Sequence, residues 1–276
     1  FCKWFRVDSQ FGLRHQLPNI MSNYFFIVSL FCYFIVFLAY VQSVPEGRIL
    51  NGLPAIKGQF PFVVSLRKDG THICGGTIIT KNYVLTAAHC VGIIKGEDYY
   101  VLDANSFTVY AGSISRLRNG VEIPVAAVIP HENYGNFQND IALVRLAEPL
   151  KYKKTIRPVK LGTSERWEHF VVAGWGLKGT NAPMAIRLQW TFLWPTKKAI
   201  CQKIVDNKTN QMICLKPKKS RGTCTYDSGS PVVDQDSHLV GVNNYNVGTC
   251  EQNNPRVFAL VSYHMGWIIK HSDLRI

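Results

Sequence analysis

The stretch TYDSGSP, at residues 225–231, contains a serine in a setting that suits a nucleophile. Ser228 follows the acidic Asp227 and precedes Gly229, so it lies in a glycine-containing turn. A serine hydroxyl is a weak nucleophile near neutral pH and needs an adjacent base. The stretch therefore directs the search to a histidine and an acidic partner elsewhere in the chain.

Two other segments supply those groups. LTAAHC (85–90) places His89 directly before Cys90, and NDIALVRL (139–146) places Asp140 at the head of an apolar run. Each segment alone is weak, since a histidine beside a cysteine is usually structural. Together they give the chain order His, Asp, Ser, which is one of the known orders of a catalytic triad.

Short β-branched and aromatic runs separated by turn residues fill the rest of the chain after residue 49, which favours an all-β class with barrels. A helix is expected at 262–273, and a short helix near 196–204. The strands expected are 62–66, 77–80, 83–87, 107–112, 141–146, 170–175, 231–234 and 239–242.

Further motifs, GRILNG (47–52), HICGGTII (72–79) and AGWG (173–176), complete a pattern that resembles the trypsin/chymotrypsin family of serine proteases. The chain is also similar to the mite group 3 allergen-type proteases, which include inactivated members. The resemblance implies two packed antiparallel six-stranded β-barrels, chymotrypsin-like, with a C-terminal helix. It covers residues 49–276.

The resemblance assigns a role to each group. Ser228 would be the nucleophile, His89 the general base and then acid, and Asp140 the partner that orients the imidazole. The backbone N–H groups of Tyr226 and Ser228 would form the oxyanion hole. The expected reaction is hydrolysis of peptide bonds in protein or peptide substrates, with no cofactor and no metal.

The same resemblance implies three disulfides, Cys74–Cys90, Cys201–Cys214 and Cys224–Cys250. Eight cysteines in all suit a secreted protein better than a cytosolic one. A zinc site built from His72, Cys74, His89 and Cys90 is the alternative, but it lacks paired Cys-x-x-Cys spacing.

The N-terminal part divides into three expected segments. Residues 1–20 are interpreted as a gene-model extension, 21–43 as a signal peptide and 44–48 as an activation propeptide. A type II membrane anchor is the alternative for the apolar stretch 25–41. Cleavage between Arg48 and Ile49 would let the new ammonium group of Ile49 pair with Asp227.

The specificity pocket departs from the family pattern. Gly222 lies at its base, where trypsins have Asp, so trypsin specificity is not expected. Asn244 and Asn246 replace Ser and Gly, and Arg256 replaces a glycine. Arg256 could favour an acidic residue before the scissile bond, block the pocket, or point outward to solvent.

Tyr226 stands where the family has glycine. A positive φ would cost about 1–2 kcal/mol there, and a peptide flip would remove one oxyanion donor. Two functions therefore stay open: an active secreted endopeptidase, and a catalytically silent or weak paralogue that binds proteins.

The net charge of +13 favours acidic partner surfaces, although a solvated basic surface is the simpler interpretation. No nucleic-acid binding motif accompanies the charge. Stable membrane association is not expected, and the protein is expected to be a monomer in the extracellular space. Residues 111–125, where the family binds calcium, hold one acid, Glu122, so calcium is not expected. Asn207 begins a glycosylation sequon.

Overall fold

The structure is a computed structural model that describes residues 52–135, 137–163, 168–206, 210–218 and 222–275. The chain forms two units, Phe1–Pro45 and Glu46–Ile276. The first unit lies outside the described residues, as do Arg48, Ile49 and Asn207. None of the described helices is long and apolar enough to cross a membrane.

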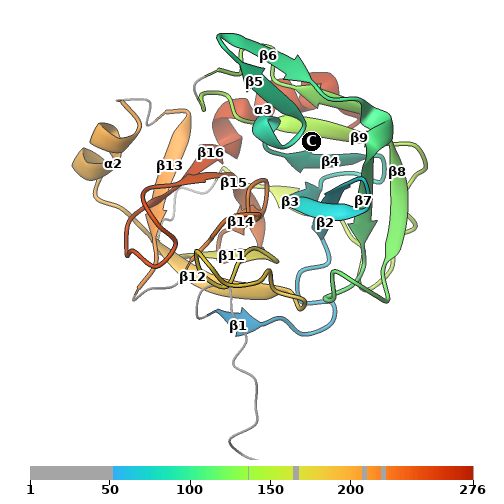
Figure 1. The fold of residues 1–276 in the computed structure, drawn as a ribbon, viewed down its shortest axis with the longest axis horizontal. Coiled ribbons are helices and arrows are strands. Elements are labelled where there is room, and N and C mark those ends of the chain that lie inside the picture. Colours follow the sequence, from blue (N-terminus) through green and yellow to red (C-terminus); the bar gives the residue numbers. More distant parts are fainter. Residues whose placement is uncertain (1–51, 136, 164–167, 207–209, 219–221, 276) are drawn as a thin grey trace, which may run out of the picture. The chain divides into compact units, whose positions relative to one another are not determined.

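The first barrel is closed by six antiparallel strands in the order β2-β3-β4-β9-β8-β7 (Figure 1). Its core is made of buried aliphatic and aromatic side chains from every strand. The strands are β2 (Val63–Lys68), β3 (Thr71–Ile78), β4 (Tyr83–Thr86), β7 (Phe107–Ala111), β8 (Val121–Pro130) and β9 (Ala142–Leu146).

The second barrel follows the order β12-β11-β14-β15-β16-β13 and closes where β12 pairs with β13. A separate core that includes Phe170, Leu193 and Phe258 fills it. The strands are β11 (Phe170–Gly174), β12 (Gln189–Pro195), β13 (Met212–Lys216), β14 (Pro231–Val233), β15 (His238–Asn246) and β16 (Arg256–Leu260).

Several short strands, turns and helices lie outside the two barrels. β1 (Leu53–Pro54) pairs with β12, β10 (Lys160–Leu161) pairs with β15, and β5 (Gly92–Lys95) forms a hairpin with β6 (Asp98–Val101). The 3₁₀ turns are η1 (Ala88–Cys90) and η2 (Ala104–Ser106), and the helices are α2 (Lys198–Ile204) and α3 (Val261–His271).

The two-barrel fold and the C-terminal helix confirm the predicted fold class. The strand expected at 77–80 overlaps only the end of β3, which runs over Thr71–Ile78, and the chain turns after it. The sequence does not predict the first part of β3, because His72, Gly75 and Gly76 weaken its apolar pattern.

The barrels meet where β3 passes the serine loop. The N–H of Gly75 donates to the carbonyl oxygen of Ser228 at 2.8 Å. A Cβ on Gly75 would overlap the Ser230 side chain, and a Cβ on Gly229 would overlap Thr86 and the Gly75 carbonyl. Gly229 also has a φ of +76°. These glycines let the loop of one barrel lie directly on a strand of the other.

Candidate active site

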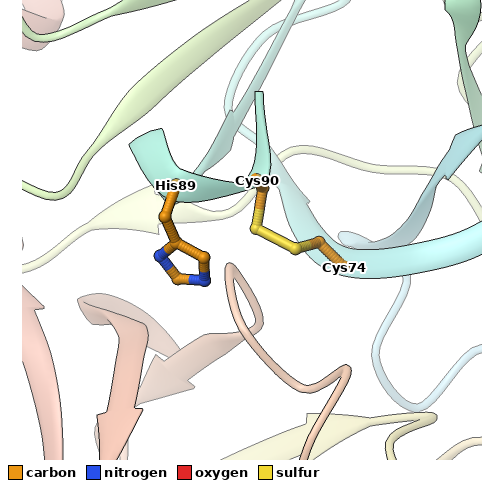
Figure 2. A group of neighbouring side chains, drawn as sticks. All are labelled: Cys74, His89 and Cys90. Carbon is orange, nitrogen blue, oxygen red and sulfur yellow. A yellow bond between two sulfur atoms is a disulfide. The ribbon is translucent and has the colours of Figure 1, made fainter. Parts of the chain in front are cut away.

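His89 is held at the barrel junction by the turn η1 and by a disulfide. Cys90 is joined to Cys74 of β3, and Figure 2 shows the imidazole of His89 pointing away from that disulfide into the space between the barrels. The three side chains are close enough to suggest a metal site. Both sulfurs are in the disulfide, so they are not available as thiolate ligands.

Asp140 is fully buried beside His89 and uses both of its oxygens on that residue. Oδ2 lies 2.7 Å from His89 Nδ1, and Oδ1 accepts the backbone N–H of His89 at 2.9 Å. A carboxylate at this position accepts a hydrogen bond from the N–H of Nδ1. The proton therefore stays on Nδ1, and Nε2 is free to act as a base.

Ser228 and His89 line one pocket of about 490 Å³. Its wall also contains Cys224, Tyr226, Asn244, Asn246 and Cys250. Within the described residues, no hydrogen bond joins Ser228 Oγ to His89. Such bonds are often long in proteins without a bound substrate and shorten when one binds.

Asp227 lies wholly inside the protein directly beneath the serine turn. Its carboxylate accepts the N–H of Gly176 at 2.8 Å and the N–H of Cys224 at 2.9 Å. Burial raises the pKa of Asp227 to about 6, and the two backbone hydrogen bonds oppose the rise. A carboxylate that is hard to ionise when alone is suited to receive a cation.

Tyr226 adopts the backbone conformation that a glycine would hold, with a φ of +72°. A non-glycine residue there costs about 1–2 kcal/mol, so surrounding contacts hold it in place. Its carbonyl oxygen accepts a hydrogen bond from His72 Nε2 at 3.1 Å. Its side chain is 38% exposed.

His72 is itself fixed by Ser65, whose Oγ lies 2.8 Å from His72 Nδ1. Burial lowers the pKa of His72 to about 4, so the ring is neutral and Nδ1 accepts the Ser65 hydroxyl. The sequence interpretation considered His72 only as a zinc ligand and missed this contact, because Tyr226 is far from it in the chain.

The far wall of the pocket is crossed by a side-chain hydrogen bond. Thr223 Oγ1 donates to Asn246 Oδ1 at 2.8 Å. The segments that carry these two residues are also joined by the disulfide Cys224–Cys250. Asn246 therefore extends into the region that the family glycine would leave open, and Gly222, with a φ of +140°, lies outside the pocket lining.

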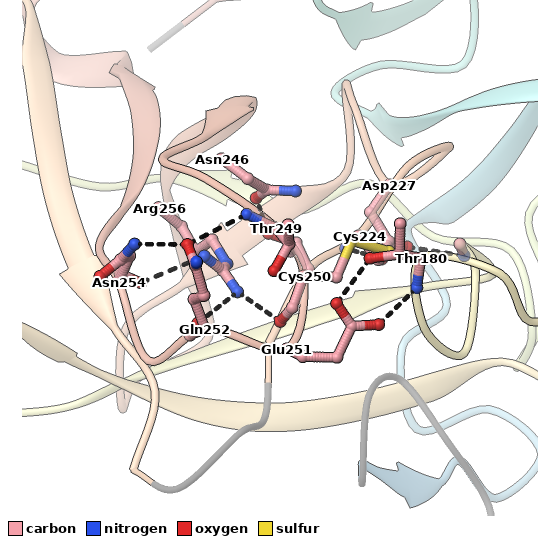
Figure 3. The surroundings of a disulfide bond; sticks show 12 residues. Thr180, Cys224, Asp227, Asn246, Thr249, Cys250, Glu251, Gln252, Asn254 and Arg256 are labelled. Atoms are coloured by element: carbon pink, nitrogen blue, oxygen red, sulfur yellow. Dashed lines mark hydrogen bonds between the residues drawn. A yellow bond between two sulfur atoms is a disulfide. The ribbon is translucent and has the colours of Figure 1, made fainter.

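Arg256 is fully buried, so the alternative in which it points outward is wrong. Its guanidinium donates to the carbonyl oxygens of Cys250, Gln252 and Asn254 at 2.8–3.2 Å (Figure 3). Burial lowers its pKa to about 10, with the charge of Glu251 opposing the change. Arg256 does not line the pocket, although its Nε has no partner among the described residues and faces Gly222.

Phe137 covers the pocket on the histidine side and was also missed. Its ring lies between His89, at 6.5 Å, and Tyr245, at 5.3 Å. Asn244 Nδ2 donates to the Phe137 carbonyl at 3.0 Å, and Phe137 has a φ of +59°. A left-handed phenylalanine leaves no signal in the sequence.

The structure contains all three disulfides that the resemblance implies, and the third, Cys201–Cys214, ties α2 to β13 away from the site.

Comparisons with known proteins agree with this geometry. The family model for trypsin matches residues 49–268. Serine protease SP24D of Anopheles gambiae is 38% identical over 224 residues, which cover 80% of each chain. Chymotrypsin-2 of Vespa crabro is 33% identical over 229 residues, covering 81% of this chain and 99% of the relative.

Among solved structures, neuropsin, a serine protease expressed in the limbic system of mouse brain, superposes with a TM-score of 0.69 at 26% identity. The match covers 79% of this chain and 97% of neuropsin. With the barrels and the histidine–serine pocket in place, these similarities lead to one conclusion: the chain belongs to the trypsin family and is a serine-type endopeptidase.

Proposed function

We propose that the protein is secreted as a zymogen, is cleaved between Arg48 and Ile49, and then hydrolyses peptide bonds with His89, Asp140 and Ser228. The observation that carries this proposal is the use of both Asp140 oxygens on His89, in a pocket that His89 shares with Ser228. That arrangement supports His89 as the base, with its Nε2 atom directed toward the Ser228 hydroxyl.

In the proposed reaction, Ser228 Oγ attacks the substrate carbonyl carbon while His89 Nε2 takes the hydroxyl proton. Asp140 stabilises the imidazolium that forms. The N–H groups of Ser228 and Tyr226 receive the developing oxyanion. His89 then gives its proton to the leaving amine, and water repeats the sequence on the acyl-serine to release the acid.

The activation step is supported by the setting of Asp227. Its buried carboxylate has two backbone donors and a raised pKa, so an arriving ammonium group would relieve the cost of ionisation. The new N-terminus of Ile49 is the group that we assign to this role. The pair would order the serine loop only after cleavage.

For substrate choice, we propose that Lys and Arg before the scissile bond are rejected and that short acidic or small side chains are preferred. Among the described residues no acidic side chain lines the pocket, so a basic substrate side chain meets no countercharge there, and the buried guanidinium of Arg256 adds a positive potential behind the pocket. The hydrogen bond between Thr223 and Asn246 limits the depth that a side chain can reach.

A silent, protein-binding paralogue is the competing function, and the substitutions Tyr226, Asn246 and Arg256 favour it. The test is to cut the chain after Arg48, confirm Ile49 as the new N-terminus, and add a fluorophosphonate probe. We expect label on Ser228 and none on the Ser228→Ala variant. If Ser228 stays unlabelled in a correctly cut chain, the proposed protease activity is rejected in favour of the protein-binding function.

The preferred substrate residue is tested separately with a peptide library, on cleaved protein from the same preparation that has not been exposed to the probe. Cleavage after Asp is expected to exceed cleavage after Lys or Arg. A flat preference for aromatic or long aliphatic residues would overturn the proposed specificity and leave the catalytic assignment intact.

A further inference from the structure

Strand β12 departs from the usual alternation of a half-buried strand, although Leu193 on its inner face belongs to the barrel core. Antiparallel strands of this kind place apolar side chains inward and polar ones outward. In β12 the inward residues Gln189 and Thr191 are polar and only 3% and 5% exposed. The alternate positions carry Trp190, Phe192 and Trp194, and we call these three aromatic residues the β12 stripe. Phe192 is exposed, the two tryptophans are half-buried, and Trp190 also packs against Phe60.

The β12 stripe is continuous. The ring centroids of Trp190 and Phe192 are 5.2 Å apart, and those of Phe192 and Trp194 are 6.1 Å apart. Phe192 is 38% exposed. Leu53 of β1, which lies beside β12 in Figure 1, is 49% exposed and pairs directly with Trp190. Residues paired across a sheet share a face, so Leu53 extends the apolar surface.

Lysines surround the Trp194 end of the stripe. The Lys218 ammonium lies 4.1 Å from the centre of the Trp194 ring. Lys216 is opposite Trp194 in the β12–β13 register and is exposed. Lysines with aromatic neighbours can keep their stems on the apolar surface while their ammonium groups reach outward.

We propose that the β12 stripe and these two lysines form a binding surface for membranes rich in anionic phospholipid. Tryptophan and phenylalanine side chains settle at the headgroup level of a bilayer, and lysines beside them attract anionic headgroups. The association is peripheral and reversible. It is distinct from the stable membrane association that the sequence does not lead us to expect.

The ring geometry favours a lipid surface over a sulfated glycan. Neighbouring rings of the stripe are inclined by 81° and 51°, so they do not form a flat platform for a sugar chain. Lys218 also covers one face of Trp194. No stripe residue lines the pocket shared by His89 and Ser228, so the β12 stripe is separate from the substrate pocket.

The experiment is sedimentation with phosphatidylcholine vesicles, with and without phosphatidylserine. The protein is purified from the medium of cells that express the whole chain, and its N-terminus is sequenced. Every variant has the same N-terminus, so any contribution from that end cancels. We expect binding to phosphatidylserine vesicles, and this binding should weaken as salt rises.

Phe192→Ser is expected to weaken binding at least tenfold, and Lys216→Gln and Lys218→Gln about fivefold each. Tyr152→Ser and Lys81→Gln change an exposed aromatic residue and an exposed lysine elsewhere and should bind like the parent protein. The unfolding temperature shows that each variant is folded.

The proposal fails if the parent protein does not sediment with the vesicles, or if the stripe variants bind as well as the controls. It also fails if the stripe variants lose retention on heparin while no form binds vesicles, since the surface would then recognise a sulfated glycan.

Discussion

The two walls of the active site differ in how far they depart from the family pattern. On the first barrel, His89 and Asp140 make two short contacts and a disulfide anchors the histidine turn. On the second barrel, Tyr226, Asn246 and Arg256 all stand where the family has glycine. The comparison teaches that the residues to which we assign the chemistry match the family pattern, while the residues to which we assign substrate selection depart from it.

The largest expected effect comes from removing a member of the proposed triad, to which both walls contribute. Ser228→Ala should lower kcat by about 10⁴–10⁶, because nucleophile and base act as one unit. His89→Ala should do the same, and the double variant should be no worse than either single one. The measurement is steady-state hydrolysis of a short peptide, with the unfolding temperature as a control. Additive losses would contradict a cooperating pair.

His72→Ala tests whether the Tyr226 backbone, on the second barrel, still contributes to the oxyanion hole. Removing the donor to the Tyr226 carbonyl should free the strained peptide and lower kcat by about 10²–10³ with little change in KM. Adding Tyr226→Gly should restore part of the loss, because glycine holds a positive φ without strain. If His72 had a structural role alone, His72→Ala would lower the unfolding temperature. It would not lower kcat selectively over KM, and Tyr226→Gly would not restore the activity.

Asp227 should make the stability of the uncleaved chain depend on pH. Its folded pKa, about 6, is above the ordinary value of 3.8. Burial of the ionised form therefore costs stability above pH 6, and the cost disappears as pH falls below about 4. The effect is on the order of 2–3 kcal/mol.

The measurement is the unfolding free energy of the uncleaved parent minus that of Asp227→Asn, between pH 4 and pH 7. The parent should gain stability relative to the variant as the pH falls. Cleavage after Arg48 should reduce this gain, because the ammonium group of Ile49 stabilises the ionised form. Equal pH profiles for parent and variant would contradict the assignment.

Asn246→Gly should have the smallest effect and acts on substrate choice alone. Loss of the Thr223–Asn246 hydrogen bond opens the pocket, so kcat/KM for a substrate with Phe before the cut should rise about tenfold. The value for an Ala substrate should not change. An equal change for both substrates would show that Asn246 does not set the depth of the pocket.

Sequence motifs were enough to find the fold and the triad candidates. His89, Asp140 and Ser228 each lie in a short continuous motif, and the barrel strands near them have ordinary apolar patterns. The direction of Arg256 could not be foreseen, because it is decided by carbonyl groups in the loop after Cys250. The presence of Arg256 in place of the family glycine indicated only that the specificity pocket differs from the family pattern.

Other features depend on contacts between distant segments or on unusual patterns. His72 lies next to Tyr226 only after the barrels pack together. β12 was not predicted, because its polar residues face inward and its aromatic residues outward. Phe137 reaches the pocket through a left-handed conformation that side-chain type does not encode.

The close approach of Gly75 to Ser230 has a consequence for how this protein can change over generations. A Cβ on Gly75 would overlap Ser230 Oγ and would also overlap the backbone Cα of Ser230, at 2.8 Å. A smaller side chain at position 230 would remove the first overlap and leave the second. A replacement at position 75 should therefore not be recovered in a genetic selection even with Ala or Gly at position 230, so position 75 is expected to stay glycine.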